Sequence, residues 1–452
     1  MYDPLLTATA ARALKYLDAL ATRPVRPDPI AVAQLSRWDI PLPEEPSSPE
    51  NTIRELDEVG SPATMALSGP RFFGFVIGGA LPVTVAAQWL ATAWDQNTGL
   101  ARVTPSTVEI ERIALKWLLD VLHLPAECGG AFVTGATMAN FTALAAARHV
   151  LLGKMGWDVE REGLFGAPAI TVVVGEEVHP TVSKALGMLG LGRERVLRVP
   201  VDDQGRMRAD ALPRISGPTI VCLQAGNVNT GAIDPIREVI AYAKKHDAWV
   251  HVDGAFGLWA AAAPDLSGRV AGIEQADSWA TDAHKWLNVP YDSGLAFVRN
   301  GQALQDTMSI HAAYLPGSVT RDSSNFTPEL SRRARGVEVW AALRTLGRGG
   351  VAEMISRNSR QARRFAEGLR AAGCEILNEV VLNQVLVSFG SPARNERIIA
   401  AIQQDGTCWC GGTVWQGKSA MRISVCCWAT TDRDVELSLD AITRLAKADQ
   451  KD

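Results

Sequence analysis

The sequence lacks an excess of either charge and has few charged residues overall. Its 452 residues include 45 Lys and Arg against 49 Asp and Glu, a formal net charge of −4. This balance gives no basic surface for nucleic acid and no acidic tail. Charged residues make up 21% of the chain and hydrophobic residues 47%, which argues against disorder and predicts a sizeable core.

Metal-ligand spacings are also missing. The seven cysteines include two close pairs, Cys408 with Cys410 and Cys426 with Cys427. These spacings are poor for zinc, and no histidine follows His311 to complete a ligand set. We therefore interpret the cysteines as buried thiols in a reducing cytoplasm and predict no metal site.

Long apolar runs are rare, with one exception. Phe72–Trp94 has no charged residue and is long enough to span a bilayer, but several glycines and Pro82 interrupt it. We expect Val83–Trp94 to form a helix of about three turns, buried on most sides in the core or at a subunit interface. Residues 1–6 lack the positive stretch and apolar core of a secretory signal, so we expect a cytoplasmic protein.

The residue patterns divide the chain into three predicted parts, residues 1–78, 79–345 and 346–452. The first has two amphipathic helical patterns, about Pro4–Ala21 and Pro49–Val59, separated by a proline-rich stretch. This pattern is typical of a helical arm that docks on another surface. The last part combines long helices with a few strands, which predicts a small α+β domain.

The central part alternates short β-branched runs with helical runs. The clearest predicted strands are Ala169–Val174, Thr219–Leu223, Trp249–Val252 and Leu295–Val298. The clearest predicted helices between them are Thr137–Leu152, Pro180–Leu189 and Ile236–His246. This alternation predicts an α/β domain with a largely parallel sheet, whose strand C-termini position the chemistry.

Two residues of this part are suited to cofactor chemistry. Lys285 lies between His284 and Trp286, where desolvation would lower the ammonium pKa and favour the neutral amine that a Schiff base needs. Asp253 follows an apolar strand and lies at its C-terminal end. Taken singly, a surface lysine and a helix-capping aspartate are the alternatives. Together they match pyridoxal phosphate, which needs an Asp on its pyridinium nitrogen and a Lys on its aldehyde.

A third segment, Gly130–Asn140, is a turn of small residues that leads from a strand into a helix. Its backbone N–H groups and the Thr134 and Thr137 hydroxyls would hold a phosphate on the helix dipole. Such turns are frequent, so the segment gains meaning only in combination with Lys285 and Asp253.

These segments together resemble the group II pyridoxal-phosphate-dependent decarboxylases, the group of aromatic-L-amino-acid, histidine and glutamate decarboxylases. The resemblance extends from about Phe72 to the Ile423 region. It rests on His284-Lys285-Trp286, Val252-Asp253, Val178–Ala185 and Asn227–Pro235. It implies a fold-type-I enzyme with a mostly parallel seven-stranded sheet flanked by helices, an N-terminal helical dimerisation arm and a small C-terminal α+β domain. It also implies pyridoxal 5′-phosphate as cofactor and a homodimer with shared active sites.

The resemblance assigns roles around the cofactor. Lys285 would form the Schiff base, Asp253 would bind the pyridinium nitrogen, and His179 would stack on the ring. Ala255 would pack beneath the ring, and Asn227 would contact the cofactor. The phosphate would be held by Thr134, Gly135, Ala136, Thr137 and His284.

The resemblance also assigns substrate-side residues. Tyr314 would deliver a proton to the substrate carbon. The alternative is that it is a surface-loop tyrosine without a catalytic role. Phe72 and Phe75 would line an apolar wall of the substrate pocket. Arg102 would either pair with a distal substrate carboxylate or have a structural role. Relatives with Phe in place of this Tyr tend towards oxidative aldehyde formation, so Tyr314 favours plain decarboxylation.

Four residues depart from the family pattern. Ala136 replaces a Gly, Met138 a Glu and Asn227 a Thr, and Asp282 stands where animal relatives often have Asn. A carboxylate should not face a phosphate without a hydrogen-bond donor, so we expect Asp282 to hydrogen-bond elsewhere.

These observations predict a pyridoxal-phosphate-dependent L-amino-acid decarboxylase, a carboxy-lyase, with a lean towards aromatic or other apolar substrates. The alternatives are another fold-type-I reaction (aldehyde synthesis, aldol cleavage, desulfuration or transamination), decarboxylation of an acidic amino acid such as glutamate, a non-catalytic homologue, and a membrane protein. The expected partners are a small-molecule amino acid and a second copy of the chain, without nucleic acid or membrane.

Overall fold

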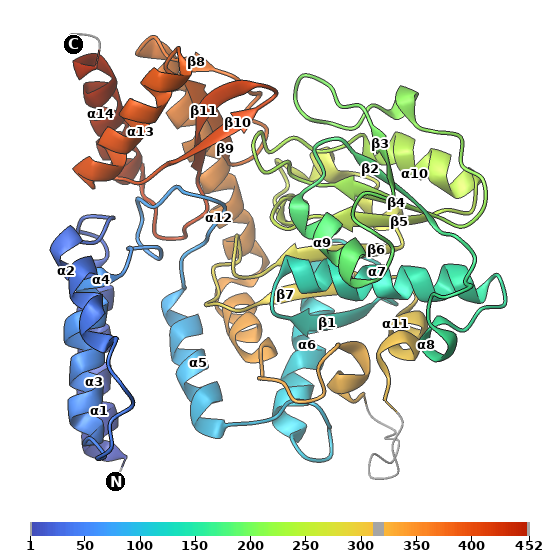
Figure 1. Ribbon diagram of the computed structural model, residues 1–452, viewed down its shortest axis with the longest axis horizontal. Helices are drawn as coiled ribbons and strands as arrows, with labels where there is room; N and C mark the ends of the chain where they lie inside the picture. Colours follow the sequence, from blue (N-terminus) through green and yellow to red (C-terminus); the bar gives the residue numbers. More distant parts are fainter. Residues whose placement is uncertain (1, 311–320, 450–452) are drawn as a thin grey trace. The chain divides into compact units, whose positions relative to one another are not determined.

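The computed structural model describes residues 2–310 and 321–449. The chain forms two compact units (Figure 1). Unit 1 comprises Met1–Gly79, Arg364–Leu377 and Leu386–Asp452, and unit 2 comprises Ala80–Arg363 and Asn378–Val385. The predicted division at residues 78 and 345 stays a prediction. Over the described ranges, every helix is too short or too polar to cross a lipid bilayer.

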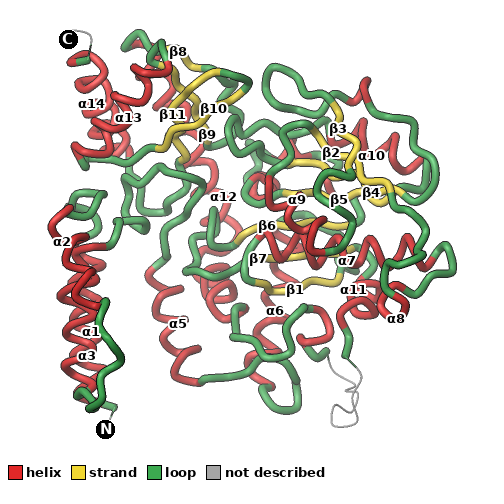
Figure 2. The backbone as a smooth tube through the Cα atoms, in the orientation of Figure 1, coloured by secondary structure: helices red, strands yellow, loops and turns green. Residues whose placement is uncertain are grey.

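Unit 2 is built on a seven-stranded sheet (Figure 2). Its strands are β1 (Gly129–Val133), β2 (Thr171–Gly175), β3 (Val196–Val199), β4 (Thr219–Gln224), β5 (Trp249–Asp253), β6 (Ser278–Asp282) and β7 (Gly294–Val298). The strand order is β1-β7-β6-β5-β4-β2-β3, and β7 alone runs antiparallel to its neighbours. The predicted mostly parallel seven-stranded sheet of an α/β fold is therefore confirmed.

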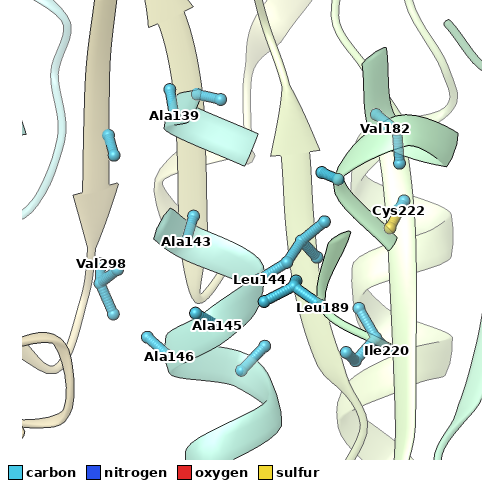
Figure 3. Close-up of a cluster of buried hydrophobic side chains, with 14 of the residues drawn as sticks. Ala139, Ala143, Leu144, Ala145, Ala146, Val182, Leu189, Ile220, Cys222 and Val298 are labelled. Atoms are coloured by element: carbon cyan, nitrogen blue, oxygen red, sulfur yellow. The ribbon is translucent and has the colours of Figure 1, made fainter. Parts of the chain in front are cut away.

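The helices of unit 2 are α5 (Pro82–Trp94), α6 (Pro105–Val121), α7 (Ala136–Gly153), α8 (Val159–Glu162), α9 (Pro180–Met188), α10 (Ile236–Lys245), α11 (Gly301–Met308) and most of α12 (Gly336–Ala371). Helix α7 packs on the sheet through a face rich in alanine, including Ala139, Ala143 and Ala146 (Figure 3). Small side chains let a helix approach the strands closely. The first turn of α7 is thereby held tightly to the sheet.

One edge of the sheet collects the ends of several strands. Because β7 is antiparallel, its first residue, Gly294, pairs with the last residue of β1, Val133, and the last residue of β6, Asp282. Asp253, at the end of β5, pairs with Ala280 of β6. The start of α7, the segment after β6 and the end of β5 therefore all emerge at this edge.

Helix α5 covers the second half of the uncharged run and is not buried as expected. Only Thr84 and Ala87 are buried, while Trp89, Leu90 and Trp94 are 46%, 55% and 43% exposed. The expectation of burial on most sides is wrong within this chain, because α5 packs through one face only, with Ala87 in a small cluster with the start of α12. The outer face of α5 is apolar and exposed within this chain.

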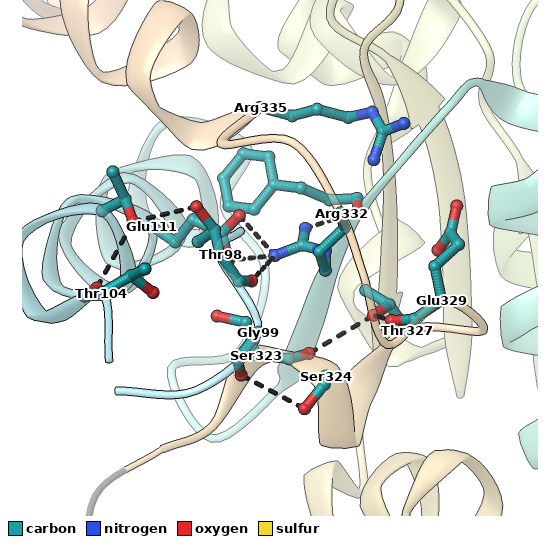
Figure 4. A network of polar contacts seen from close by, with 12 residues as sticks. Thr98, Gly99, Thr104, Glu111, Ser323, Ser324, Thr327, Glu329, Arg332 and Arg335 are labelled. Carbon is teal, nitrogen blue, oxygen red and sulfur yellow. Dashed lines mark hydrogen bonds and ion pairs between the residues drawn. The ribbon is translucent and has the colours of Figure 1, made fainter. Parts of the chain in front are cut away.

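A buried ion pair ties α6 to the sheet (Figure 4). The Arg332 guanidinium donates to both Glu111 carboxylate oxygens, at 2.7 and 2.9 Å, and to the carbonyl oxygens of Thr98 and Phe132, each at 2.8 Å. Both charged side chains are buried, so removing either partner would leave an uncompensated charge. The bond to Phe132 fixes α6 next to the end of β1.

Unit 1 contains the N-terminal helices and a small α+β part. Its elements include α1 (Asp3–Ala19), α2 (Pro29–Ala33), α3 (Pro49–Glu55), α4 (Ser61–Ala63), α13 (Pro392–Asp405), α14 (Asp432–Ala448) and a sheet of order β10-β11-β9-β8. The strands are β8 (Glu375–Ile376), β9 (Gln384–Ser388), β10 (Gly411–Trp415) and β11 (Lys418–Ser424). The two helices predicted near residues 337 and 351 form α12, interrupted at Gly347, where φ is 58°.

Five of the seven cysteines are buried as predicted: Cys222, Cys408, Cys410, Cys426 and Cys427. Cys128 and Cys374 are only partly buried, which corrects the prediction for these two. Burial raises the pKa of the Cys222 thiol to about 12 and so keeps it protonated.

Candidate active site

Lys285 lies in the segment between β6 and β7, at the edge where the strands end. Its Nζ is 3.2 Å from Oδ2 of Asp282, and Oδ1 of the same carboxylate accepts a hydrogen bond from the Ala136 N–H at 2.6 Å. The sequence led us to expect that Asp282 hydrogen-bonds away from the phosphate turn, but its donor is an N–H group of that turn. The lysine and the first turn of α7 are joined through one buried carboxylate.

His284 lies on the same segment, with Nε2 3.6 Å from Asp282 Oδ1. Its Nδ1 accepts a hydrogen bond from the Ser293 N–H at 3.1 Å, and its ring lies against Tyr291, with the ring centroids 4.3 Å apart. Burial lowers the pKa of the His284 imidazole. The neutral ring therefore carries its proton on Nε2, which can donate to an anion at the turn.

The first turn of α7 has the backbone of an anion site. Gly135 is the N-cap residue, so the N–H groups that follow it have no carbonyl partner within the helix. The turn approaches β7 so closely that a Cβ on Gly294 would lie 2.4 Å from the Gly135 Cα. Thr134, Gly135 and Thr137 are half-buried and Ala136 is buried. Ala255 is half-buried beside them, and its carbonyl accepts the Asp282 N–H at 3.0 Å.

Asp253 is 5% exposed at the end of β5. Oδ1 accepts a hydrogen bond from the Ala255 N–H at 3.1 Å, and Oδ2 accepts one from Asn140 Nδ2 at 3.3 Å. Within residues 2–310 and 321–449, no cationic side chain forms an ion pair with this carboxylate. Each oxygen keeps a lone pair that can accept an N–H from a ligand.

His179 caps the N-terminus of α9. Its Nδ1 lies 2.7 Å from Thr181 Oγ1 and accepts the Thr181 N–H at 3.3 Å. Thr181 Oγ1 also lies 3.5 Å from Asn140 Nδ2, the amide that contacts Asp253. The predicted ring-stacking histidine and the predicted partner of the ring nitrogen are thus linked by one polar chain.

Asn227 is buried, and its amide is engaged within its own loop. Oδ1 accepts the N–H groups of Asn229 and Thr230, at 2.8 and 3.2 Å, and Nδ2 donates to Glu177 Oε2 at 2.9 Å. Its contact with the cofactor stays a prediction. Glu177, two residues before His179, is a site neighbour that the sequence did not reveal.

The sequence reasoning also missed Asn140 and His251. Both are fully buried, and His251 Nε2 lies 2.9 Å from Asn140 Oδ1. A histidine inside the apolar run Trp249–Val252, and an asparagine one helical turn into α7, were available signals. Buried polar side chains need partners, and these two are near the end of the strand that positions Asp253.

The predicted substrate-side residues lie in different parts of the structure. Tyr314 lies outside the described residues. Arg102 is exposed in the segment before α6 of unit 2. Phe72 and Phe75 belong to unit 1, where both rings stack on Trp409, with centroids 5.1 and 6.0 Å away. Their roles towards a substrate stay predictions.

The residues present fit pyridoxal phosphate. An amine, a buried carboxylate with lone pairs to spare, a stacking imidazole and a helix N-terminus with a glycine N-cap all belong to unit 2. Because the N-cap residue is glycine, no N-cap side chain covers the turn, although the Ala136 N–H already donates to Asp282. An α/β sheet with these groups at the edge formed by its strand ends defines a fold-type-I pyridoxal-phosphate enzyme.

Comparisons with known proteins specify the family. The conserved domain of pyridoxal-dependent decarboxylases matches residues 33–390. The chain therefore belongs to the pyridoxal-dependent decarboxylase family, which confirms the predicted family, the cofactor and the carboxy-lyase class.

Individual relatives agree with this membership. An aromatic-L-amino-acid decarboxylase of Bacillus atrophaeus is 32% identical over 326 residues, 68% of this chain and 64% of that protein. The aromatic-L-amino-acid decarboxylase of Rattus norvegicus is 25% identical over 96% of this chain and 95% of its own. A crystal structure of Oryza sativa TDC with PLP and tryptamine has a TM-score of 0.90 at 21% identity, covering 98% of this chain and 97% of that one, and supports the fold.

Proposed function

We propose that the protein removes the α-carboxylate of an aromatic L-amino acid as CO2 and releases the corresponding amine. The observation that carries the proposal is the convergence of Lys285, Asp253 and the first turn of α7 at one edge of the sheet. Family membership supports the reaction class. The names of relatives that act on aromatic amino acids support the substrate class.

Each end of the cofactor has a residue suited to hold it. Lys285 would hold the aldehyde carbon, and Asp253 would accept the N–H of the ring nitrogen. His179 and Ala255 would contact the two ring faces, and Asn227 would contact the cofactor from its loop. Thr134, Gly135, Ala136, Thr137 and His284 would hold the phosphate. When bound, pyridoxal phosphate supplies an electron sink for the electron pair left by the departing carboxylate.

The protein's own groups would control two protons. Asp253 would keep a proton on the ring nitrogen, because its carboxylate has no competing cation among the described side chains. Asp282 forms an ion pair with Lys285, with Oδ2 3.2 Å from Nζ. This ion pair must open before the amine acts as a nucleophile. Tyr314, outside the described residues, is the proposed proton donor to the substrate carbon.

Phe72 and Phe75 stay the proposed apolar wall for an aromatic substrate side chain, as the family resemblance implies. Within unit 1, both rings stack on Trp409. Arg102 is the residue that would serve an acidic substrate instead.

A homodimer with shared active sites is part of the proposal. The exposed face of α5, with Trp89, Leu90 and Trp94, is apolar and uncharged. Such a patch is typical of a subunit interface. A cytoplasmic location remains an expectation from the sequence.

Release of labelled CO2 tests the proposal directly. The purified holoenzyme is incubated with carboxyl-labelled L-tryptophan, L-tyrosine, L-phenylalanine and L-glutamate, and the amine product is measured beside CO2. We expect equimolar CO2 and amine from an aromatic substrate. No CO2 from any amino acid would overturn the reaction, aldehyde in place of amine would indicate an oxidative reaction, and a preference for glutamate would overturn the substrate class.

The variant Asp253→Ala tests the assigned role of the carboxylate. Without an anion to keep the ring nitrogen protonated, we expect nearly all CO2 release to disappear while the fold is retained. Circular dichroism serves as the check of folding. Unchanged turnover in this variant would contradict the assignment.

A further inference from the structure

We propose that Asn140 is a positioning residue for the cofactor, because its one side-chain amide holds Asp253 and, through Thr181, His179. The inference rests on the proposed function and deepens it. Asn140 comes from the second turn of α7, Asp253 from the end of β5, and Thr181 from the start of α9. Three elements that surround the predicted ring position therefore meet at one amide.

The contacts form a continuous buried chain. Trp249 Nε1 donates to Ser278 Oγ at 2.9 Å, and Ser278 Oγ lies 2.9 Å from His251 Nδ1. His251 Nε2 lies 2.9 Å from Asn140 Oδ1. Asn140 Nδ2 then reaches Asp253 Oδ2 at 3.3 Å and Thr181 Oγ1 at 3.5 Å.

The chemistry of these groups sets the direction of every bond in the chain. An ionised carboxylate only accepts hydrogen bonds, so the Asn140 NH2 group must face Asp253 and the Asn140 carbonyl must face His251. His251 must then donate through Nε2. Burial lowers the pKa of His251 to about 3, so the ring is neutral and its Nδ1 accepts the Ser278 hydroxyl proton.

The Asn140 side chain is therefore an uncharged group of fixed orientation that supports the Asp253 carboxylate. A flipped Asn140 amide would place its oxygen against Asp253 and its NH2 group against the His251 N–H, losing both bonds. Because the donor is neutral, it orients the Asp253 carboxylate without adding an opposite charge. A lysine or arginine in its place would add one. The carboxylate therefore remains available to the ring nitrogen.

The Asn140 amide also links Asp253 to His179, the two residues predicted to contact the cofactor ring. Thr181, at the far side of the Asn140 NH2 group, donates its N–H to His179 Nδ1. A hydroxyl can accept from Asn140 and donate to His179 at the same time. Loss of Asn140 would therefore loosen both the ring-nitrogen partner and the ring-stacking imidazole.

The first test replaces Asn140 with leucine, which keeps the number and branching of the side-chain heavy atoms and removes the amide. Pyridoxal phosphate is titrated into the apoprotein, and its Kd is measured by quenching of tryptophan fluorescence. We expect binding weaker by about 10- to 100-fold, the effect of losing a hydrogen bond to a buried charge. The control is Thr142→Val on the same helix. Thr142 is equally buried, but its hydroxyl has no hydrogen-bond partner within residues 2–310 and 321–449, so this variant should bind like the wild type.

The second test, Asn140→Asp, has a signature that a structural role would not produce. The new carboxylate still accepts from His251 but faces Asp253 across about the same 3.3 Å. One proton shared by the two carboxylates restores the support at low pH, and its loss at higher pH leaves two repelling charges. Because sharing raises the pKa of the pair, we expect the ratio of variant to wild-type Kd to rise with pH.

The outcomes separate this inference from the proposed function. A wild-type protein that releases no CO2 refutes the function and leaves the Kd comparison intact. A wild type that binds the cofactor, with Asn140→Leu within twofold of it or Thr142→Val equally impaired, overturns the positioning role. If Asn140→Leu does not fold, Asn140→Asp tests the inference instead. A ratio of variant to wild-type Kd that does not change with pH would then overturn it.

Discussion

At the scale of single residues, the site depends on a carboxylate in an unexpected place. Asp282 pairs with Lys285 and accepts the first N–H of α7, the groups expected to meet the cofactor's aldehyde and phosphate. A fixed negative charge at a helix N-terminus satisfies the turn but also opposes a phosphate arriving there. Asp282 therefore stabilises the turn through a hydrogen bond, while its negative charge repels a phosphate that binds there.

Replacing Asp282 with asparagine should separate these two effects. The amide oxygen can still accept the Ala136 N–H, while the charge facing the phosphate is removed. We expect pyridoxal phosphate to bind the apoprotein about fivefold more tightly, equivalent to about 1 kcal/mol. Inorganic phosphate should compete more strongly in the same titration.

Asp247→Asn is the matched control, because Asp247 pairs with Lys154 at an exposed site. It removes one negative charge far from the turn and should leave the Kd unchanged. Weaker cofactor binding in Asp282→Asn would show that the hydrogen bond to the turn outweighs the repulsion.

The sequence predicted the residues that we propose as reactive, but not the residues that support them. Lys285 and Asp253 were predictable because their chemistry is unusual at a strand end or among aromatic residues. Asn140 and His251 lie in segments whose apolar pattern indicates only core. Their role depends on strand order, because the pairing of β5 with β6 brings Ser278 beside His251.

At the scale of elements, the close backbone contact between α7 and β7 controls the shape of the turn. The predicted bounds of α7, α9 and α10 agree with the structure to within a residue, because caps and periodicity define them. The sequence did not predict how β7 pairs with its neighbouring strands. Only the antiparallel register of β7 places Gly294 against Gly135.

Gly294→Ala should therefore impair the turn without touching a reactive group. Its Cβ would lie 2.4 Å from the Gly135 Cα, so strand and helix must separate. We expect a loss of roughly 1–3 kcal/mol in unfolding free energy, the usual range for overpacking, together with weaker cofactor binding. Denaturant unfolding and cofactor titration measure the two effects.

Gly153→Ala at the other end of α7 is the control for Gly294→Ala. A Cβ there would have no atom of the described part of the chain within 4 Å. The added methyl group should leave cofactor affinity unchanged and raise stability slightly, by about 0.5–1 kcal/mol. Equal cofactor affinity in the two variants would show that the backbone contact does not shape the turn.

At the scale of the whole molecule, the uncharged helix α5 is the feature that a single chain leaves incomplete. The apolar sequence of α5 predicted that the helix is buried. Packing within unit 2 buries only its inner face, which contacts the start of α12. Sequence patterns report how apolar a face is but not which chain covers it. The exposed Trp89, Leu90 and Trp94 therefore favour a second subunit.

Leu90→Asp should weaken this association. A charge in an apolar interface must be desolvated without a partner, so we expect the dimer Kd to rise by at least tenfold. Sedimentation velocity over a concentration series measures the shift from dimer to monomer. Phe165→Asp is the control, since Phe165 is 100% exposed in a loop of the same unit. A wild-type protein that sediments as a monomer would contradict the proposed dimer.

The single antiparallel strand also affects how the chain tolerates insertions. Because β7 runs back along β6, the intervening segment that holds His284 and Lys285 leaves and re-enters the sheet at the same edge. A parallel β7 would have required a crossover to the opposite edge. Added or deleted residues in this segment would therefore shift the lysine without disturbing the sheet. Length changes elsewhere, at the opposite ends of the strands, would leave the reactive amine in place.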